Sequence, residues 1–143
     1  MRKGEDFTGV CVVFYCHDGS GNYLFGKRSS ACRDEVGRWD PGGGGVKFGE
    51  SVIDALHREV REEYSTEIVE YEFLGFRDVH RENEGKKTHW ITLDYRVLVH
   101  PESVANGDPE KIEEICWCTL DNLPEPMHSQ EVMCRTLYPD KLR

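Results

Sequence analysis

The sequence predicts a layered α/β or α+β domain, because segments typical of buried strands are combined with helices. Residues 9–16 form a short continuous apolar run, which is typical of a buried strand. Residues 51–64 place apolar side chains at helical spacing, and residues 89–99 alternate polar with apolar side chains. Helices mixed with strands that lie far apart in the sequence indicate packed layers around one core.

The other strands and the connectors follow from turn, glycine and proline signals. Further strands are expected at 23–28, as the hairpin partner of the first strand, at 68–79 and at 114–120. Polar or glycine-rich connectors are expected at 17–22, 29–45, 80–88 and 100–111. The sequence contains no internal repeat, low-complexity tract or linker, so a single domain over residues 1–143 is expected.

Two helices complete the expected fold. Ser51 is a suitable N-cap for the first, which should end near Tyr64, where Ser65 and Thr66 weaken helical propensity. The second is expected at about 129–137, between two prolines.

Composition and charge limit the classes of function. Hydrophobic residues make up 38% of the chain and charged residues 31%, and no apolar run approaches the roughly 20 residues that span a bilayer. The first residues lack the apolar stretch of a secretory signal, so a cytoplasmic protein without a membrane partner is expected. A net charge of -9, from 27 acids against 18 Lys and Arg, disfavours a stable nucleic-acid complex. An acidic site can still act on an anionic substrate when metal ions reverse the local charge.

The six cysteines are interpreted as reduced packing residues rather than a disulfide framework or a zinc site. No two of them form a Cys-x-x-Cys pair, and no histidine completes a zinc-binding spacing. Cys116 and Cys118 alternate with Trp117 and should share one face of a strand. Reduced cysteines fit an intracellular setting.

The first helix carries the most informative pattern in the chain. Glu59, Glu62 and Glu63 follow i, i+3, i+4 spacing and therefore project from neighbouring positions on one surface, where like charges repel. At 100° per residue, Glu63 falls between Val52 and Leu56, inside the apolar stripe. It is predicted to be partly buried, which is costly for a carboxylate unless a metal ion or a firm hydrogen bond compensates it.

The glycine-rich loop before this helix nearly matches a phosphate-binding P-loop, with Gly44 and Gly49 at the required spacing. Glu50 stands where that motif needs its phosphate-binding lysine, so this interpretation is rejected. The glycines instead allow the backbone to approach a metal or a substrate closely. Arg58 is expected to pair with Glu62 one turn later and to orient a carboxylate; the alternative is an ordinary surface pair worth about 0.3–0.5 kcal/mol.

Residues 44–66 resemble the Nudix box, Gly-x5-Glu-x7-Arg-Glu-U-x-Glu-Glu-x-Gly-U, in which U is aliphatic. Seven residues match in type and spacing: Gly44, Glu50, Arg58, Glu59, Val60, Glu62 and Glu63. Ser65 replaces the last glycine and Thr66 the last aliphatic residue, which puts the local turn in doubt more than the activity. Residues 39–43 and 117–124 also look like this family, so the resemblance extends over most of the domain.

The resemblance implies a Nudix α/β/α sandwich with a mixed β-sheet, and hydrolysis of a nucleoside diphosphate linked to another moiety. It also implies a Mg²⁺ site, with Mn²⁺ as an alternative. The implied metal ligands are Glu59, Glu62, Glu63 and the Gly44 carbonyl, together with a further carboxylate from Glu113 or Glu114. The implied catalytic residues are Arg58, Glu59 and Glu62, with a glutamate of the box or of a later loop as the general base. A charged loop without a catalytic role is the alternative for residues 110–114.

Features outside the box bear on the substrate. Residues 67–100 lack the proline usual in ADP-ribose hydrolases of the family, and 79–86 lack the tyrosine common in its dinucleoside-polyphosphate hydrolases. Residues 88–92 and 109–111 look most like nucleoside-triphosphate pyrophosphohydrolases. Lys27 and Arg28 are candidates for phosphate contacts, with ordinary surface charge as the alternative.

Trp90 is a candidate for stacking on a base, and burial in the core is its alternative. A Nudix-fold regulatory module that binds a nucleotide without turnover is the competing hypothesis, as are hydrolases of sugar nucleotides or ADP-ribose. The complete set of box acids favours the enzyme. The expected partner is a small nucleotide, and a homodimer remains open.

Overall fold

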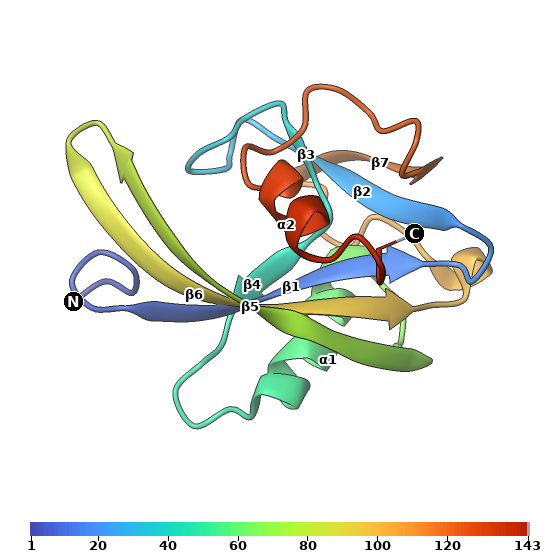
Figure 1. The fold of residues 1–143 in the computed structure, drawn as a ribbon, viewed down its shortest axis with the longest axis horizontal. Coiled ribbons are helices and arrows are strands. Elements are labelled where there is room, and N and C mark those ends of the chain that lie inside the picture. The colour runs from blue at the N-terminus through green and yellow to red at the C-terminus, as the bar shows by residue number, and fades with distance from the viewer. Residues whose placement is uncertain (143) are drawn as a thin grey trace.

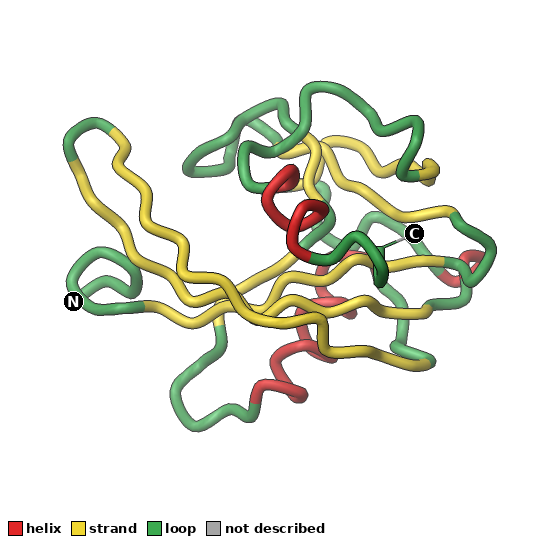
Figure 2. The backbone as a smooth tube through the Cα atoms, in the orientation of Figure 1, coloured by secondary structure: helices red, strands yellow, loops and turns green. Residues whose placement is uncertain are grey.

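A computed structural model describes residues 1–142. It contains one mixed seven-stranded sheet and two α-helices, which cover opposite faces of the sheet (Figures 1 and 2). The strands are β1 (Gly9–His17), β2 (Asn22–Arg28), β3 (Trp39–Asp40), β4 (Gly43–Gly45), β5 (Glu70–Asn83), β6 (Lys86–Leu98) and β7 (Ile112–Thr119). The helices are α1 (Val52–Tyr64), α2 (Glu131–Leu137) and a short 3₁₀ turn, η1 (Pro101–Ser103). The α/β/α sandwich is therefore confirmed.

The sheet is organised around β1. Its path runs β3-β2-β1-β6-β5, with β1 and β6 parallel and the other pairs antiparallel. The first half of β1 also pairs with β4, and β7 pairs with β2. No helix among residues 1–142 is long and apolar enough to cross a membrane.

The alternation of side chains along β1 divides the core between the two faces. On the α1 face, Val12 and Phe14 pack with Leu56, Val60 and other buried residues. On the α2 face, a second cluster includes Tyr15, Phe25, Cys134 and Tyr138. Both faces of β1 are covered, which explains why its sequence is continuously apolar.

```
```

The β5–β6 hairpin is longer than predicted. Residues 80–88 were expected to form a polar connector, but both strands continue through this segment and only Glu84 and Gly85 form the turn. Both turn residues have positive φ, at 53° and 79°, as a tight two-residue hairpin requires. The hairpin projects from the body of the molecule (Figure 1), so its outer part is polar without being a loop.

The structure refines two other sequence expectations. The segment 29–45 was expected to be a loop, yet it contains β3 and β4, because glycines can pair with β1 without any apolar pattern. β2 is the antiparallel partner of β1 across the turn, as expected, but their pairing is confined to His17 and Tyr23. β2 pairs with β7 along its whole length and with β3 at Gly26 and Lys27.

The two predicted helices are confirmed. α1 begins directly after Ser51, whose hydroxyl accepts a hydrogen bond from the Asp54 amide at 3.1 Å. α2 begins two residues later than expected and ends at Leu137 as predicted. All six cysteines are free, and Cys116 and Cys118 both pack against the core on the α2 face.

Candidate metal and catalytic site

The predicted site residues of the box are brought together where the C-terminal half of α1 packs against the glycine strand β4. A loop after η1 closes the end of the helix, because the amides of Ala105 and Gly107 donate to the carbonyls of Tyr64 and Glu63 at 3.0 and 2.9 Å. The helix is capped by Ser65, which has φ +53°, a left-handed conformation that favours glycine. The serine found in place of the box glycine thus keeps the expected turn, with some backbone strain.

Arg58 is the centre of the charge network. Its guanidinium donates from Nε to Glu50 Oε2 at 2.8 Å and from Nη2 to Glu50 Oε1 at 3.0 Å. Nη2 also donates to the Gly45 carbonyl at 3.0 Å, and Nη1 donates to Glu59 Oε1 at 2.7 Å. This fork lowers the pKa of Glu50 to about 2. Arg58 therefore ties the loop to the helix.

The partner predicted for Arg58 was only partly right. Glu62 lies 3.4 Å from Arg58 Nη1, the longest contact in the network, and its side chain is 56% exposed. The carboxylate held by the fork is Glu50, eight residues earlier in the sequence. Helical spacing considers partners one turn away and therefore did not include a residue of the preceding loop.

Glu63 is partly buried, as predicted. Its Oε2 accepts a hydrogen bond from the Gly43 amide at 3.1 Å. Burial raises its pKa well above the ordinary value, and the nearby charges of Asp40, Glu59 and Asp108 raise it further. Burial also raises the pKa of Glu59, although Arg58 opposes that shift. Two adjacent acids are thus held where their ionised forms are unfavourable without a compensating cation.

Gly44 is required by close contact with one of these acids. A Cβ atom at residue 44 would lie 2.1 Å from the carboxyl carbon of Glu59. Any side chain there would occupy the space of that carboxylate. The glycine strand therefore forms a cradle for the acids of α1.

Two acids near Glu63 were not proposed from the sequence as site residues. Asp40 lies in the Trp-Asp-Pro segment before the glycine strand, and Asp108 lies in the loop that closes α1. The sequence signal for Asp40 was the resemblance of residues 39–43 to the family. Asp108 had no signal, because its approach depends on how the loop packs.

Glu113 and Lys27 lie elsewhere. Lys27 Nζ pairs with Glu113 Oε2 at 3.5 Å, and the Glu113 side chain is 59% exposed. The structure does not place Glu113 among the acids around Glu63, nor Lys27 on the wall of the main cavity. The two residues form a surface ion pair. This is the alternative considered for Lys27, whereas Glu113 lies in strand β7 and not in the charged loop that was its alternative.

Arg28 and Trp90 do line the main cavity, but both already have partners. Arg28 donates to Asp40 Oδ2 at 3.0 Å and to Asp34 Oδ1 at 2.9 Å. The Trp90 indole lies so close to Gly4 that a Cβ there would approach it to 2.2 Å. Arg28 is therefore compensated by acids, and Trp90 packs against the N-terminal segment with part of its surface toward the cavity.

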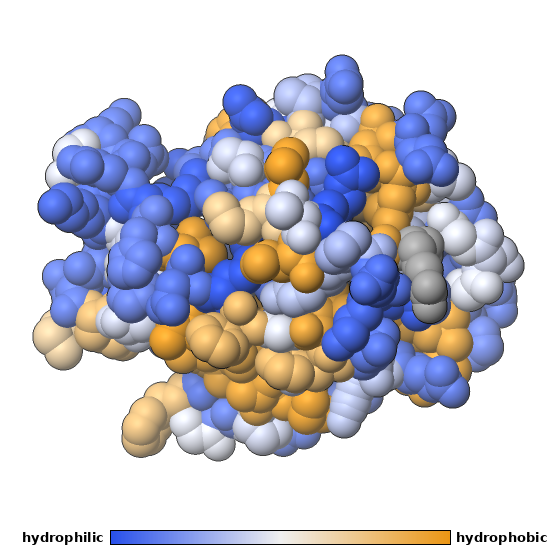
Figure 3. Space-filling model, viewed as in Figure 1, coloured by the Kyte–Doolittle hydropathy of each residue, from blue (hydrophilic) through white to orange (hydrophobic). Residues whose placement is uncertain are grey.

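This cavity has a volume of about 860 Å³ and lies on the α2 face of the sheet. The glycine strand forms one wall, the β5–β6 hairpin another, and α2 contributes Glu131 and Cys134. The space-filling view shows the surface hollowed between the projecting hairpin and the body (Figure 3). A nucleotide-sized ligand fits a volume of this order.

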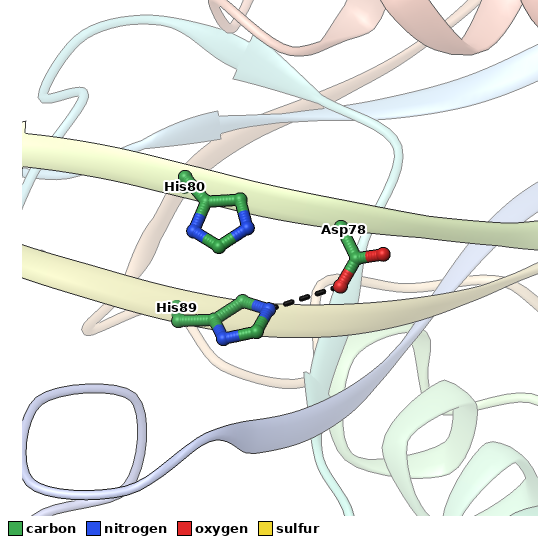
Figure 4. A group of neighbouring side chains, drawn as sticks. All are labelled: Asp78, His80 and His89. Carbon is green, nitrogen blue, oxygen red and sulfur yellow. Dashed lines mark hydrogen bonds and ion pairs between the residues drawn. The ribbon is translucent and has the colours of Figure 1, made fainter.

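One compact group of potential metal ligands lies apart from the box. Within residues 1–142, Asp78, His80 and His89 are the group of three or more whose ligand atoms all lie within 4.8 Å of one another. They come from neighbouring positions of β5 and β6 (Figure 4), and His89 Nε2 lies 2.9 Å from Asp78 Oδ1. His89 Nδ1 also contacts Thr8 Oγ1 at 3.1 Å, so both ring nitrogens of His89 are engaged. The group is partly exposed and is not connected to the box acids.

The comparisons with known proteins agree with this arrangement. The model of the NUDIX domain family matches residues 7–135. The chain is 29% identical over 123 residues to nucleoside triphosphatase NudI of Enterobacter sp. (strain 638), covering 81% of this chain and 84% of that protein. The chain therefore belongs to the Nudix family, and it is a hydrolase of acid anhydrides in phosphorus-containing compounds.

Solved structures support the same fold. A MutT NUDIX hydrolase from Burkholderia pseudomallei superposes with a TM-score of 0.81 at 25% identity, covering 92% of this chain and 98% of that one. The NUDIX domain of Shewanella oneidensis NrtR, in complex with ADP ribose, gives a TM-score of 0.72 at 18% identity, with 95% and 88% covered. The second likeness concerns the fold alone.

Proposed function

We propose that the chain is a Mg²⁺-dependent pyrophosphohydrolase that cleaves nucleoside triphosphates to the monophosphate and pyrophosphate, with Mn²⁺ as a possible substitute. The observation that carries this proposal is the pair of acids, Glu59 and Glu63, held against a glycine strand beside a nucleotide-sized cavity. The name of the Enterobacter relative, a nucleoside triphosphatase, supports the substrate class.

The residues fit a divalent cation. Carboxylate and carbonyl oxygens are the donors that Mg²⁺ prefers. Glu63 has a raised pKa because its charge is buried among other acids, and a cation would compensate that charge. When bound, such a cation neutralises pyrophosphate, stabilises charge on the transferring phosphorus and lowers the pKa of a water. The proposed ligands are Glu59, Glu62, Glu63 and the Gly44 carbonyl.

We assign separate tasks to the residues of the network. Glu62 is the most exposed of the box acids and is the proposed general base: one of its carboxylate oxygens would bind the cation, and the other would accept a proton from water. Arg58 acts by position: it fixes Glu59 and the Gly45 carbonyl while Glu50 fixes Arg58. The role of the extra carboxylate, assigned to Glu113 from the sequence, is better supported for Asp108, which lies close enough to affect Glu63.

The fold and the composition also bear on the domain organisation and on the cellular location of the protein. We propose one domain over residues 1–143, since both cores are built on the same sheet. Six free cysteines support a cytoplasmic setting.

A nucleotide panel tests the proposed function. Intact protein with Mg²⁺ is supplied with nucleoside triphosphates, ADP-ribose, sugar nucleotides and dinucleoside polyphosphates, and pyrophosphate and phosphate are measured separately. The proposal expects pyrophosphate from triphosphates. Faster cleavage of ADP-ribose than of any nucleoside triphosphate would make ADP-ribose, and not the triphosphates, the substrate class. No turnover of any substrate with Mg²⁺ or Mn²⁺ would contradict the catalytic role of these residues.

A further inference from the structure

The cavity on the α2 face has a polar floor that the metal site does not use. Strand register places Gly45, Cys11, Thr92 and Arg77 side by side across β4, β1, β6 and β5. Arg77 and Thr92 are both buried and both line the cavity. The row therefore leads from the glycine strand to two buried polar side chains.

Asp94 holds the Arg77 guanidinium in place, but one guanidinium nitrogen, Nη1, takes no part in this contact. Its Nε and Nη2 donate to the two carboxylate oxygens of Asp94 at 2.8 and 2.9 Å. The Tyr138 hydroxyl donates to Asp94 Oδ2 at 2.8 Å, which fixes that carboxylate in turn. Arg77 Nη1 is buried and has no hydrogen-bond partner among the described residues. The guanidinium thus offers unused N–H groups and, being a guanidinium, can only donate.

Thr92, on the neighbouring strand β6, also has a buried polar atom without a partner within residues 1–142. This atom is the hydroxyl oxygen Oγ1. A buried polar group without a partner destabilises a protein, and native proteins contain few of them. Thr92 and Arg77 are paired in register and share the same cavity. A ligand that accepts hydrogen bonds from both would remove both costs.

We propose that Arg77 and Thr92 bind a ring carbonyl oxygen of the substrate's nucleobase, so that the enzyme selects bases with a carbonyl group over adenine. This inference rests on the proposed hydrolysis of nucleoside triphosphates. A carbonyl oxygen accepts two hydrogen bonds, matching one guanidinium N–H and one hydroxyl. Adenine carries an exocyclic amine, a donor, where hypoxanthine and guanine carry the carbonyl. The amine would face the donating guanidinium.

The distance across the sheet suits a bound nucleotide. Gly45 and Arg77 are separated by three inter-strand steps, which corresponds to roughly 14 Å at the usual strand spacing. The glycine strand also contacts Glu59 and Glu63, so the phosphates would lie at that end of the row. The base would then reach the floor formed by Arg77 and Thr92.

A matched pair of substrates tests this assignment. Inosine and adenosine triphosphates differ at position 6, where inosine has the carbonyl and adenosine the amine, and at the adjacent ring nitrogen. We expect kcat/KM to be at least about tenfold higher for inosine triphosphate, because a site built for hydrogen bonding rejects an analogue that cannot pair. Thr92→Val removes the hydroxyl at nearly constant volume and should reduce this ratio severalfold.

Stability separates recognition from a structural role. If the Thr92 hydroxyl is paired only when a ligand is bound, Thr92→Val should keep or raise the Tm of the free protein, because the unpaired buried hydroxyl is removed. Thr92→Ser keeps the hydroxyl and should retain the preference for inosine. Thr119→Val, at an exposed position of β7, is the matched control and should change neither ratio nor Tm. An unchanged ratio in Thr92→Val, or no preference in the unmodified protein, would overturn the inference.

Binding of the product distinguishes this inference from the proposed function. Inosine and adenosine monophosphates are titrated calorimetrically without divalent metal, so that turnover is not needed. Tighter binding of inosine monophosphate, lost in Thr92→Val, supports the base site even if no triphosphate is hydrolysed. Equal binding of both, or no binding of inosine monophosphate, contradicts it.

Discussion

The two faces of the sheet use arginine in different ways. On the α1 face, Arg58 contacts Glu50, Glu59 and the Gly45 carbonyl of β4, so all three guanidinium nitrogens are engaged. On the α2 face, Arg77 donates to Asp94, and its Nη1 has no hydrogen-bond partner within residues 1–142. A network that engages all its nitrogens can orient other groups without a ligand. An arginine with one unpaired nitrogen is suited to recognise one.

The two faces also differ in which polar groups lack a compensating partner. On the α1 side the uncompensated group is a negative charge, because Glu63 is buried among other acids. On the α2 side the groups without a partner, within residues 1–142, include two hydrogen-bond donors, Arg77 Nη1 and the Thr92 hydroxyl. A nucleotide with a divalent cation can compensate both sides at once. This contrast separates chemistry on one face from recognition on the other.

The largest effect is expected from Glu62→Gln on the α1 face. Loss of the proposed general base should lower kcat by about 10²–10⁴-fold. The fold should be retained, or slightly stabilised, because a like-charge contact in the acid cluster is removed. Steady-state kinetics and thermal denaturation measure both effects. Glu67→Gln, an exposed acid outside the box, is the control, and full activity in Glu62→Gln would contradict the assignment.

Arg58→Lys should have the next largest effect. Lysine keeps the charge but cannot make the two-point contact with Glu50, so Glu59 would lose its fixed orientation. We expect a loss of about 10–100-fold in kcat/KM and weaker activation by Mg²⁺, as for other residues that orient metal ligands.

The chain offers a matched control for that substitution. Arg61 makes the same kind of two-point contact with Glu67, at 2.7 and 3.0 Å, on the exposed side of α1. Arg61→Lys should leave kcat/KM nearly unchanged. Equal losses in the two lysine variants would show that the Arg58 network does not orient the site.

A third, smaller effect concerns stability and pH in the metal-free protein. Because the pKa of Glu63 is raised in the folded state, its contribution to stability is present below the ordinary value and is lost as pH rises through the folded pKa. Glu63→Gln should therefore stabilise the metal-free protein by about 1–3 kcal/mol at neutral pH. Near pH 4 the difference should disappear.

Calorimetry in the presence of a chelator measures this difference. Addition of Mg²⁺ should raise the Tm of the unmodified protein and have little effect on Glu63→Gln. A variant that is less stable than the unmodified protein at neutral pH would indicate that Glu63 is compensated without a cation.

The smallest effect is expected at the end of α1. Ser65 has φ +53°, so Ser65→Gly should relieve strain and stabilise the protein by about 1 kcal/mol. Urea denaturation would show this as a higher midpoint with an unchanged slope. Activity should not change, since the cap lies outside the metal and base sites. A lower midpoint would mean that the serine side chain stabilises the closing loop.

The sequence predicted the elements that have local chemical signals. Ser51 and the apolar stripe identified α1 with its correct ends, and the angular position of Glu63 predicted its partial burial. The β5–β6 hairpin was predicted too short because its outer strands are polar on both sides. Its Glu84-Gly85 turn was the signal that could have corrected this.

Long-range contacts account for what the sequence did not predict in the site. Asp108 approaches Glu63 only because its loop packs against the end of α1. Thr92 was recognised as one polar position in an alternating strand. Its proximity to Arg77 depends on the register between β5 and β6, which no local pattern specifies.

One kinetic comparison tests the division between the two faces most directly. The kcat/KM values for inosine and adenosine triphosphates are measured with Mg²⁺ for the unmodified protein, Glu62→Gln and Thr92→Val. We expect Glu62→Gln to lower both values by the same factor, and Thr92→Val to reduce the preference for inosine while leaving kcat nearly unchanged. A changed preference in Glu62→Gln, or an equal loss for both substrates in Thr92→Val, would contradict the separation of chemistry from recognition.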